Sequence, residues 1–466
     1  MPKNVLTFFY LRYCKARDFG INKISGIIYL LIVVLSLDTV INVLSSGLGI
    51  QVSSFGGVTL FVIIGSTTII CQLFIIQFVS RTSLAIRQRV RHIRLMHVAM
   101  TTSQYFLMLL LVYVMIEIVS TGGYSSISSI LVTIVSYMMS ISLMGIFTMI
   151  FLTWYKSNRS SVLVLLYGLS FATVVIASLA LLPVWIHVFS EQMPPRILPT
   201  GDVFYLSSEE GSNWKVLSKI YQYSDIASFF LKWGGTALIL YHYSHKIGRA
   251  KYWFLLSLPL VYFSTLIIYH FHIYEPHDEL ESLIFFGIVS LNSTFGGILF
   301  YLAFKLTSES FTSNKVFRNY LLMAGYGFMV FFSATQSNVV TTVYPPFGFA
   351  TVSSYGLGSY LILIGLYLSA LSVSQDENLR NMIKRSTLSE SKFLHSIGTS
   401  ATEREKVIVS KAVDKTKRQQ EAIRKDIGIG TSLSEEDVKE YVKEVELEEG
   451  EVQEKNKEKS STTTEA

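Results

Sequence analysis

The chain has 466 residues, of which 50% are hydrophobic and only 15% are charged, and its formal net charge is +6. Because ordinary soluble domains carry about 25% charged residues, this composition excludes a soluble globular protein and indicates an integral membrane protein. The basic residues form short clusters between apolar runs, which is typical of juxtamembrane charge and argues against a nucleic-acid-binding surface.

Ten apolar stretches follow one another along the chain, each about as long as a helix that crosses a hydrocarbon core of about 30 Å. The first is longer than the hydrophobic region of a signal peptide and has no clear cleavage site, so we expect a retained anchor. The ninth is the least apolar, because it turns polar early. The sequence therefore predicts an all-α transmembrane helix bundle with spans at about 24–45, 57–80, 98–119, 126–153, 161–189, 225–244, 253–274, 283–304, 319–336 and 351–372.

The distribution of Lys and Arg predicts the orientation of this bundle. If the N-terminal segment 1–23 is cytoplasmic, the inner segments hold 18 Lys and Arg, whereas the outer segments hold three, all in the long loop 190–224. The positive-inside rule then places both termini in the cytoplasm. Several acidic residues, Asp225 among them, fall on the outer side in this topology, although acids contribute little to orientation.

Three charged residues fall inside predicted spans, where an ionised side chain costs on the order of 3 kcal/mol. Asp38 is the deepest, and Glu117 and Lys232 lie nearer the outer ends of their spans. If Asp38 faces the bundle and pairs with a basic or hydroxyl partner, it marks a transport or signalling core. The alternative is a span boundary misplaced by a few residues. For Glu117 and Lys232, the ordinary interpretation is that the side chains extend toward the interface.

A basic segment, residues 81–97, follows the second span on the inner side. Its arginines alternate with apolar residues, so we expect the segment to extend the helix along the inner surface and to contact lipid phosphates. A docking site for the acidic end of the tail is the second interpretation. The arginines that carry these predictions are Arg87, Arg89, Arg91 and Arg94.

Histidines and carboxylates gather in YHFHIYEPHDELE, residues 269–281, at the outer end of the seventh span. A helix turns about 100° per residue, so His270 and His272 cannot bind one ion unless the helix ends there. Imidazole and carboxylate ligands together suit zinc, copper or nickel, or a pH-sensing group. The other interpretation is an ordinary polar membrane interface. The ligand or proton-sensing candidates are His187, His270, His272, Glu275, His277, Asp278 and Glu279.

The outer segment before the last span is rich in glycine, proline and aromatic residues, so its backbone should be irregular. Irregular backbone at membrane depth must be buried in protein or line water. We therefore predict a cap over an outward cavity, with a plain exposed loop as the alternative. The cap residues are Tyr344, Pro345, Pro346, Phe347 and Gly348.

The last 94 residues, 373–466, hold 17 Lys and Arg and 20 Asp and Glu, and predict a soluble cytoplasmic tail that is helical to residue 449 and disordered over 450–466. The last predicted helix has a narrow apolar face with i, i+3, i+4, i+7 spacing. Such a face packs against the neighbouring helix of the tail, against a second copy in a coiled coil, or against a partner protein; a solvated, weakly helical tail is the alternative. The face consists of Val438, Tyr441, Val442 and Val445.

The end of the chain carries a resemblance. The string YPPFGFATVSSYGLGSYLILIGLYLSALSVSQDENLR (344–380), followed by MIKRS, SESKFLHSIGTS and SLSEEDVKEYV, resembles an uncharacterised multi-pass membrane protein family of ammonia-oxidising archaea. The resemblance covers about the last 110 residues. It implies a polar SxSQD exit from the membrane and a helical cytoplasmic tail, and it implies no catalytic residues.

Enzyme chemistry has little support, because the sequence contains no Walker A, GxSxG or HExxH motif and no cysteine nucleophile with a basic neighbour. We therefore expect a protein that is not an enzyme and has no cofactor. The first hypothesis is a sensor that reads an extracytoplasmic signal and passes it to a cytoplasmic partner through the tail. The second is a secondary transporter with five plus five spans, although no sequence symmetry is visible. A non-catalytic subunit of a membrane complex is a third.

Overall fold

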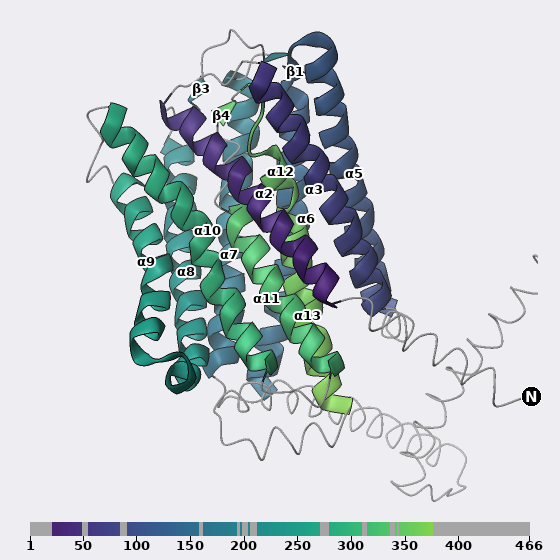
Figure 1. Ribbon diagram of the computed structural model, residues 1–466, viewed down its shortest axis with the longest axis vertical. Helices are drawn as coiled ribbons and strands as arrows, with labels where there is room; N and C mark the ends of the chain where they lie inside the picture. Colours follow the sequence, from purple (N-terminus) through teal and green to yellow (C-terminus); the bar gives the residue numbers. More distant parts are fainter. Residues whose placement is uncertain are drawn as a thin grey trace, which may run out of the picture.

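Among the residues that the computed structural model of this protein describes, ten long helices pack side by side as one bundle (Figure 1). The structure describes residues 21–48, 55–83, 91–157, 162–192, 196–197, 204–205, 212–270, 279–309, 315–335, 341–342 and 344–375. The long helices are α2 (Ile21–Leu48), α3 (Phe55–Thr82), α5 (Arg91–Thr121), α6 (Ser126–Ser157), α7 (Val162–Gln192), α8 (Ser212–Ile247), α9 (Arg249–His270), α10 (Glu279–Glu309), α11 (Lys315–Thr335) and α13 (Tyr355–Gln375).

Each predicted span overlaps one of these helices, and the prediction of a helical bundle with several apolar spans is confirmed. Within the described part of the chain, six stretches are long enough and apolar enough, by length and composition, to cross a membrane: Ile24–Asn42, Phe55–Thr82, Ile93–Thr121, Ser126–Lys156, Val162–His187 and Phe349–Ser372. The other four long helices, α8 to α11, are not among these six. Helix α8 begins at Ser212, so it contains the predicted span 225–244 and also takes in the end of the predicted loop 190–224.

Two short β-ladders join loops at one end of the bundle, the upper end in Figure 1. Strand β1 (Tyr124–Ser125) pairs antiparallel with β2 (Arg196–Ile197), and β3 (Phe204–Tyr205) pairs antiparallel with β4 (Thr341–Thr342). All four strands belong to loops that the charge distribution places outside. The pairing of β3 with β4 therefore joins the loop before α8 to the loop before α12, which belong to different halves of the chain.

The exposed side chains on the bundle surface are largely apolar. Val33 on α2, Leu109 and Ile116 on α5, and Met149 on α6 are each more than 60% exposed. Water disfavours so much contiguous apolar surface, whereas lipid tails accept it. The bundle surface therefore suits contact with a lipid bilayer.

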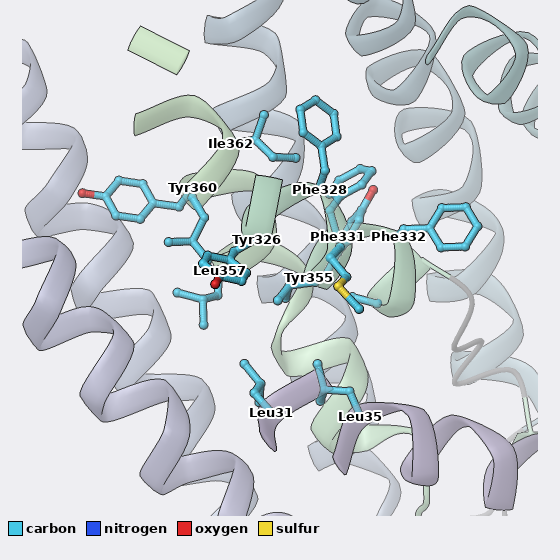
Figure 2. Packing of buried hydrophobic residues seen from close by; sticks show 14 of the residues in the cluster. Leu31, Leu35, Tyr326, Phe328, Phe331, Phe332, Tyr355, Leu357, Tyr360 and Ile362 are labelled. Carbon is cyan, nitrogen blue, oxygen red and sulfur yellow. The ribbon is translucent and has the colours of Figure 1, made fainter. Parts of the chain in front are cut away.

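Helices α11 and α13 form the centre of the bundle and are buried along most of their lengths. Their backbones touch at glycines: a Cβ added at Gly327 would lie 2.6 Å from the backbone nitrogen of Ile362, and one at Gly358 would lie 2.7 Å from that of Phe331. Small residues at such positions let membrane helices approach closely. Around this seam, side chains from α2, α11 and α13 fill the core (Figure 2).

Candidate functional site

The last span is interrupted before it becomes a continuous helix. Its chain runs through the buried residues Tyr344 to Gly348, forms the five-residue helix α12 (Phe349–Ser353), breaks at Ser354 and continues as α13. Gly348 has φ of 95°, in the left-handed region that favours glycine. Figure 1 shows α12 inside the bundle, beside α2 and α6. The interruption thus places irregular backbone among packed helices.

Asp38 of α2 satisfies the first backbone donors of this interrupted segment. Its buried carboxylate accepts hydrogen bonds from the Gly348 N–H at 2.9 Å, the Thr351 N–H at 2.9 Å and the Thr351 hydroxyl at 2.8 Å. A helix leaves its first N–H groups unpaired, and a carboxylate there supplies acceptors and suits the positive end of the helix. Asp38 is therefore an N-cap provided by another helix.

Two glutamines hold the other end of α12. The Gln72 amide on α3 donates to the hydroxyls of Ser354 at 2.8 Å and Ser353 at 3.3 Å. The Gln104 amide on α5 donates to the Gln72 side-chain oxygen at 3.0 Å and to the Ser353 carbonyl at 2.9 Å. All four residues are buried. Together with Asp38 of α2, this network fixes the segment to three different helices, which makes its position specific.

A cavity lies beside the interruption, with about 50 Å³ of room for water-sized molecules. That is enough for more than one water. Its lining comes from α6, α7, α8, α9 and α11, together with Val352 of α12 and Tyr355 of α13. The polar lining residues are Tyr137, Ser178, Tyr221, Asp225, Lys232, Thr335 and Tyr355, and the apolar lining includes Phe229, Phe263, Phe331 and Phe332.

Two opposite charges of α8 face this cavity, Asp225 and Lys232. The Lys232 ammonium lies 5.0 Å from the centre of the Phe331 ring, close enough for a cation–π interaction. Lys232 thus points into the bundle, so the interpretation that its side chain extends toward the interface does not describe its position. Asp225 was placed among the outer acids because the sixth span was predicted to begin there. The seven-residue spacing to Lys232 is the signal that could have linked them, since residues i and i+7 share a helix face.

The residues of the predicted cap, 344–348, are all buried in the bundle. The Phe347 ring packs edge-on against the Phe61 ring, with ring centres 5.8 Å apart. The cavity lining begins further along the chain, at Val352. The aromatic side chains draw this segment into the bundle, because burial of such large apolar surfaces is favourable.

Glu117 lies near the C-terminal end of α5, the end that the charge distribution predicts to be outside. The side chain is half-buried, and its carboxylate accepts a hydrogen bond from the Ser125 N–H at 3.1 Å. Ser125 directly precedes the first turn of α6, and a carboxylate near the N-terminus of a helix stabilises that helix. Glu117 therefore has a structural partner away from the cavity.

The predicted histidine-rich rim is only partly described. His187 stacks on Trp214 with ring centres 4.2 Å apart. His270 ends α9 and Glu279 begins α10, while the predicted ligands His272, Glu275, His277 and Asp278 lie outside the described residues. Within the described ranges, no three His, Cys, Asp or Glu side chains are grouped as a metal site would need. The metal hypothesis for this rim therefore stays a prediction.

The predicted cytoplasmic contacts are also described only in part. Arg91 and Arg94 lie in the first turn of α5, and the Arg94 side chain is exposed. Arg87, Arg89 and the tail face formed by Val438, Tyr441, Val442 and Val445 lie outside the described residues. Lipid contact by the arginines and partner binding by the tail remain predictions.

Sequence reasoning missed the glutamines and the helix break. Gln72 and Gln104 were not singled out, although an amide within an apolar run is a signal of a buried hydrogen-bonding partner.

The resemblance to the archaeal family remains a prediction. No protein-family model, no curated protein and no solved structure matches this chain, so its function must be argued from the interrupted helix and the cavity beside it.

Proposed function

We propose that this integral membrane protein is a secondary transporter that binds a small polar solute in the cavity beside α12. The observation that carries the proposal is the interrupted helix itself: α12 and the start of α13 border a cavity inside the bundle. In this proposal all ten long helices cross the membrane and both termini face the cytoplasm.

Interrupted helices are costly in membranes. Backbone groups that leave a regular helix need other partners, because lipid offers none. Here Asp38, Gln72 and Gln104 supply partners to the segment around α12. Secondary transporters use broken helices of this kind to present backbone ends and side chains to a solute near the middle of the bilayer. The combination of a break, a polar network and a cavity supports the same use here.

The ten-span arrangement has a physical rationale even where a helix is less apolar. Helix α11 is buried by its neighbours over nearly its whole length, so little of it would contact lipid. A central helix can therefore carry residues such as Asn319 and Tyr320 without exposing them to hydrocarbon. Lys232 of α8 likewise faces the cavity. Polar residues inside a bundle mark functional surfaces in many membrane proteins.

The sensor hypothesis uses the same cavity as a receptor pocket. It adds a cytoplasmic output, through the apolar face that the sequence predicts in the tail, and a complex subunit would use that face for assembly. Deletion of residues 401–466 distinguishes the sensor from the transporter. If the tail signals, the deletion should abolish recovery of a cytoplasmic partner. The transporter hypothesis predicts that uptake continues without those residues.

The test of transport is uptake by proteoliposomes that contain the full chain, measured with a panel of labelled amino acids, amines, carboxylates and sugars. The blocking variant is Ala177→Trp, because Ala177 of α7 lines the cavity. The matched control is Leu179→Trp on the same helix, because Leu179 is 53% exposed on the bundle surface. Val352→Phe fills the cavity from the side of α12. It is the second blocking variant, used if Ala177→Trp does not fold.

We expect uptake of at least one solute class by the wild type and by Leu179→Trp, and at least a tenfold lower rate for the blocking variant. Size-exclusion profiles establish that each variant is folded. Binding of a solute without uptake, in protein reconstituted in either orientation, would contradict transport and support a receptor pocket. Equal uptake by the blocked and control variants would remove this cavity from the pathway.

A further inference from the structure

The two charges that face the cavity define what it can bind. Asp225 and Lys232 lie seven residues apart on α8, which places them on the same face with a rise of about 10 Å between their Cα atoms. Both line the same cavity. The site therefore presents a carboxylate and an ammonium group at different depths along one wall.

Neither charge is neutralised by direct contact with an opposite charge in the part of the chain that the structure describes. The two groups are close enough to interact electrostatically, but they form no ion pair within 4.0 Å. The Lys232 ammonium lies 5.0 Å from the centre of the Phe331 ring. Both side chains are only partly exposed, and a charge that is partly removed from water without a close partner is unfavourable, so a ligand that pairs with both charges is preferred.

The rest of the lining fits a small dipolar ligand. The phenol groups of Tyr137 and Tyr355 approach each other, with ring centres 5.3 Å apart, and Tyr355 lies within 3.5 Å of the Ser178 hydroxyl. Hydroxyls of this kind donate to carboxylates and accept from ammonium groups. Phe229 and Phe263 stack at 4.0 Å and form an apolar wall. The modest volume admits only a ligand of a few heavy atoms.

We propose that the cavity binds a small zwitterion, whose ammonium group pairs with the Asp225 carboxylate and whose carboxylate pairs with the Lys232 ammonium. A cation alone would leave Lys232 unpaired, and an anion alone would leave Asp225 unpaired. The role of this zwitterion as a transported substrate rests on the proposed function. The binding itself does not, because a receptor pocket with the same charges would have the same preference.

The test is ligand binding to the purified full chain, measured by calorimetric titration and by the shift in melting temperature. The zwitterions are glycine, β-alanine and γ-aminobutyrate, which differ in the distance between their charges. Propylamine keeps only the ammonium group, and propionate keeps only the carboxylate. We expect at least one zwitterion to bind at least tenfold more tightly than either singly charged compound.

Charge-removing variants test the assignment of each end. Asp225→Asn should weaken zwitterion binding at least tenfold and strengthen propionate binding relative to the wild type, because Lys232 remains. Lys232→Met should weaken zwitterion binding similarly and strengthen propylamine binding. The control is Lys251→Met, because Lys251 is exposed on α9 and does not line the cavity. Its zwitterion affinity should equal that of the wild type.

The results separate this inference from the proposed function. Zwitterion binding without uptake into proteoliposomes would support the zwitterion as the ligand class and contradict transport. If the protein takes up an uncharged or singly charged solute but binds no zwitterion, the result would support transport and overturn the zwitterion as the ligand class. Binding of no zwitterion in the series would also overturn the ligand class. So would binding of propylamine or propionate as tightly as the zwitterions, or unchanged zwitterion affinities in Asp225→Asn and Lys232→Met.

Discussion

The carboxylate of Asp38 accepts two hydrogen bonds from Thr351, one from its backbone N–H at 2.9 Å and one from its hydroxyl at 2.8 Å, although the residues lie 313 positions apart. The first long helix of the chain thereby caps the short helix that precedes the last. The Thr351 hydroxyl also lies 3.1 Å from the Leu35 carbonyl of the same first helix. This joint between α2 and α12 holds irregular backbone in the centre of the bundle.

Asp38→Asn should destabilise the protein by about 2 kcal/mol. The amide keeps one oxygen acceptor but turns its NH₂ group toward a backbone donor, so a buried N–H loses its partner. Unfolding in a denaturant series in detergent measures the change. The control is Ser36→Ala, because the Ser36 hydroxyl bonds only within its own helix, to the Ile32 carbonyl. Equal stability of Asp38→Asn and the wild type would show that Asp38 does not hold α12.

Asp38→Asn also tests the transport hypothesis, if the variant remains folded. Loss of the carboxylate frees the N-terminus of α12, which borders the cavity through Val352. We expect at least a tenfold drop in proteoliposome uptake, with the size-exclusion profile unchanged. Normal uptake by a folded Asp38→Asn variant would exclude Asp38 from the transport mechanism.

Gly358→Ala should destabilise the bundle by about 1–3 kcal/mol, because the added Cβ would lie 2.7 Å from the backbone nitrogen of Phe331 and the two helices would have to separate. Gly145→Ala on α6 is the matched control, since a Cβ there meets nothing within 4 Å. The control should be neutral or slightly stabilising, because alanine favours helix more than glycine does. Equal melting temperatures for both variants would contradict the close contact of α11 and α13.

The glutamine network should appear as coupling in a double-mutant cycle. Gln72→Leu and Gln104→Leu each remove partners of the other residue and of α12. We expect a coupling energy of about 0.5–1.5 kcal/mol from unfolding measurements on the single and double variants. Strict additivity of the two effects would mean that the amides act independently.

Cys71 should resist thiol reagents in the folded protein. Its side chain is only 2% exposed, in the middle of α3. Mass spectrometry after treatment with a maleimide should show Cys71 modified only after denaturation. Rapid modification of Cys71 in the native protein would mean that α3 packs differently from the structure.

The sequence predicted the positions of the helices well, because each predicted apolar run overlaps one long helix of the described residues, although only six of these helices contain a stretch apolar enough to cross a membrane by length and composition. It also identified Asp38, since a single carboxylate in the run LIVVLSLDTVINVL is conspicuous. Its partner could not be predicted, because a contact between residues 38 and 351 depends on how helices distant in sequence pack.

The cavity was harder to predict for a related reason. Asp225 falls where the apolar run begins, so hydropathy alone assigns it to the outer loop. In the structure, residues 212–222, a mixture of polar and apolar side chains, extend the helix before it, and Asp225 lines the same cavity as Lys232. The break at Ser354 likewise has no local signal, because the flanking residues SSYGLGSY suit either a helix or a loop.

The most direct test of alternating access is the reactivity of one cysteine in the cavity. In a Cys14→Ser, Cys71→Ala background, Ala177→Cys is reconstituted in liposomes and treated with a membrane-impermeant thiol reagent, added outside or trapped inside. The control is Ala303→Cys, since Ala303 of α10 is buried and does not line the cavity. We predict that Ala177→Cys reacts from both sides of the membrane and that Ala303→Cys reacts from neither. Reaction of Ala177→Cys from one side only, with and without zwitterion, would contradict a transporter and identify the cavity as a receptor pocket.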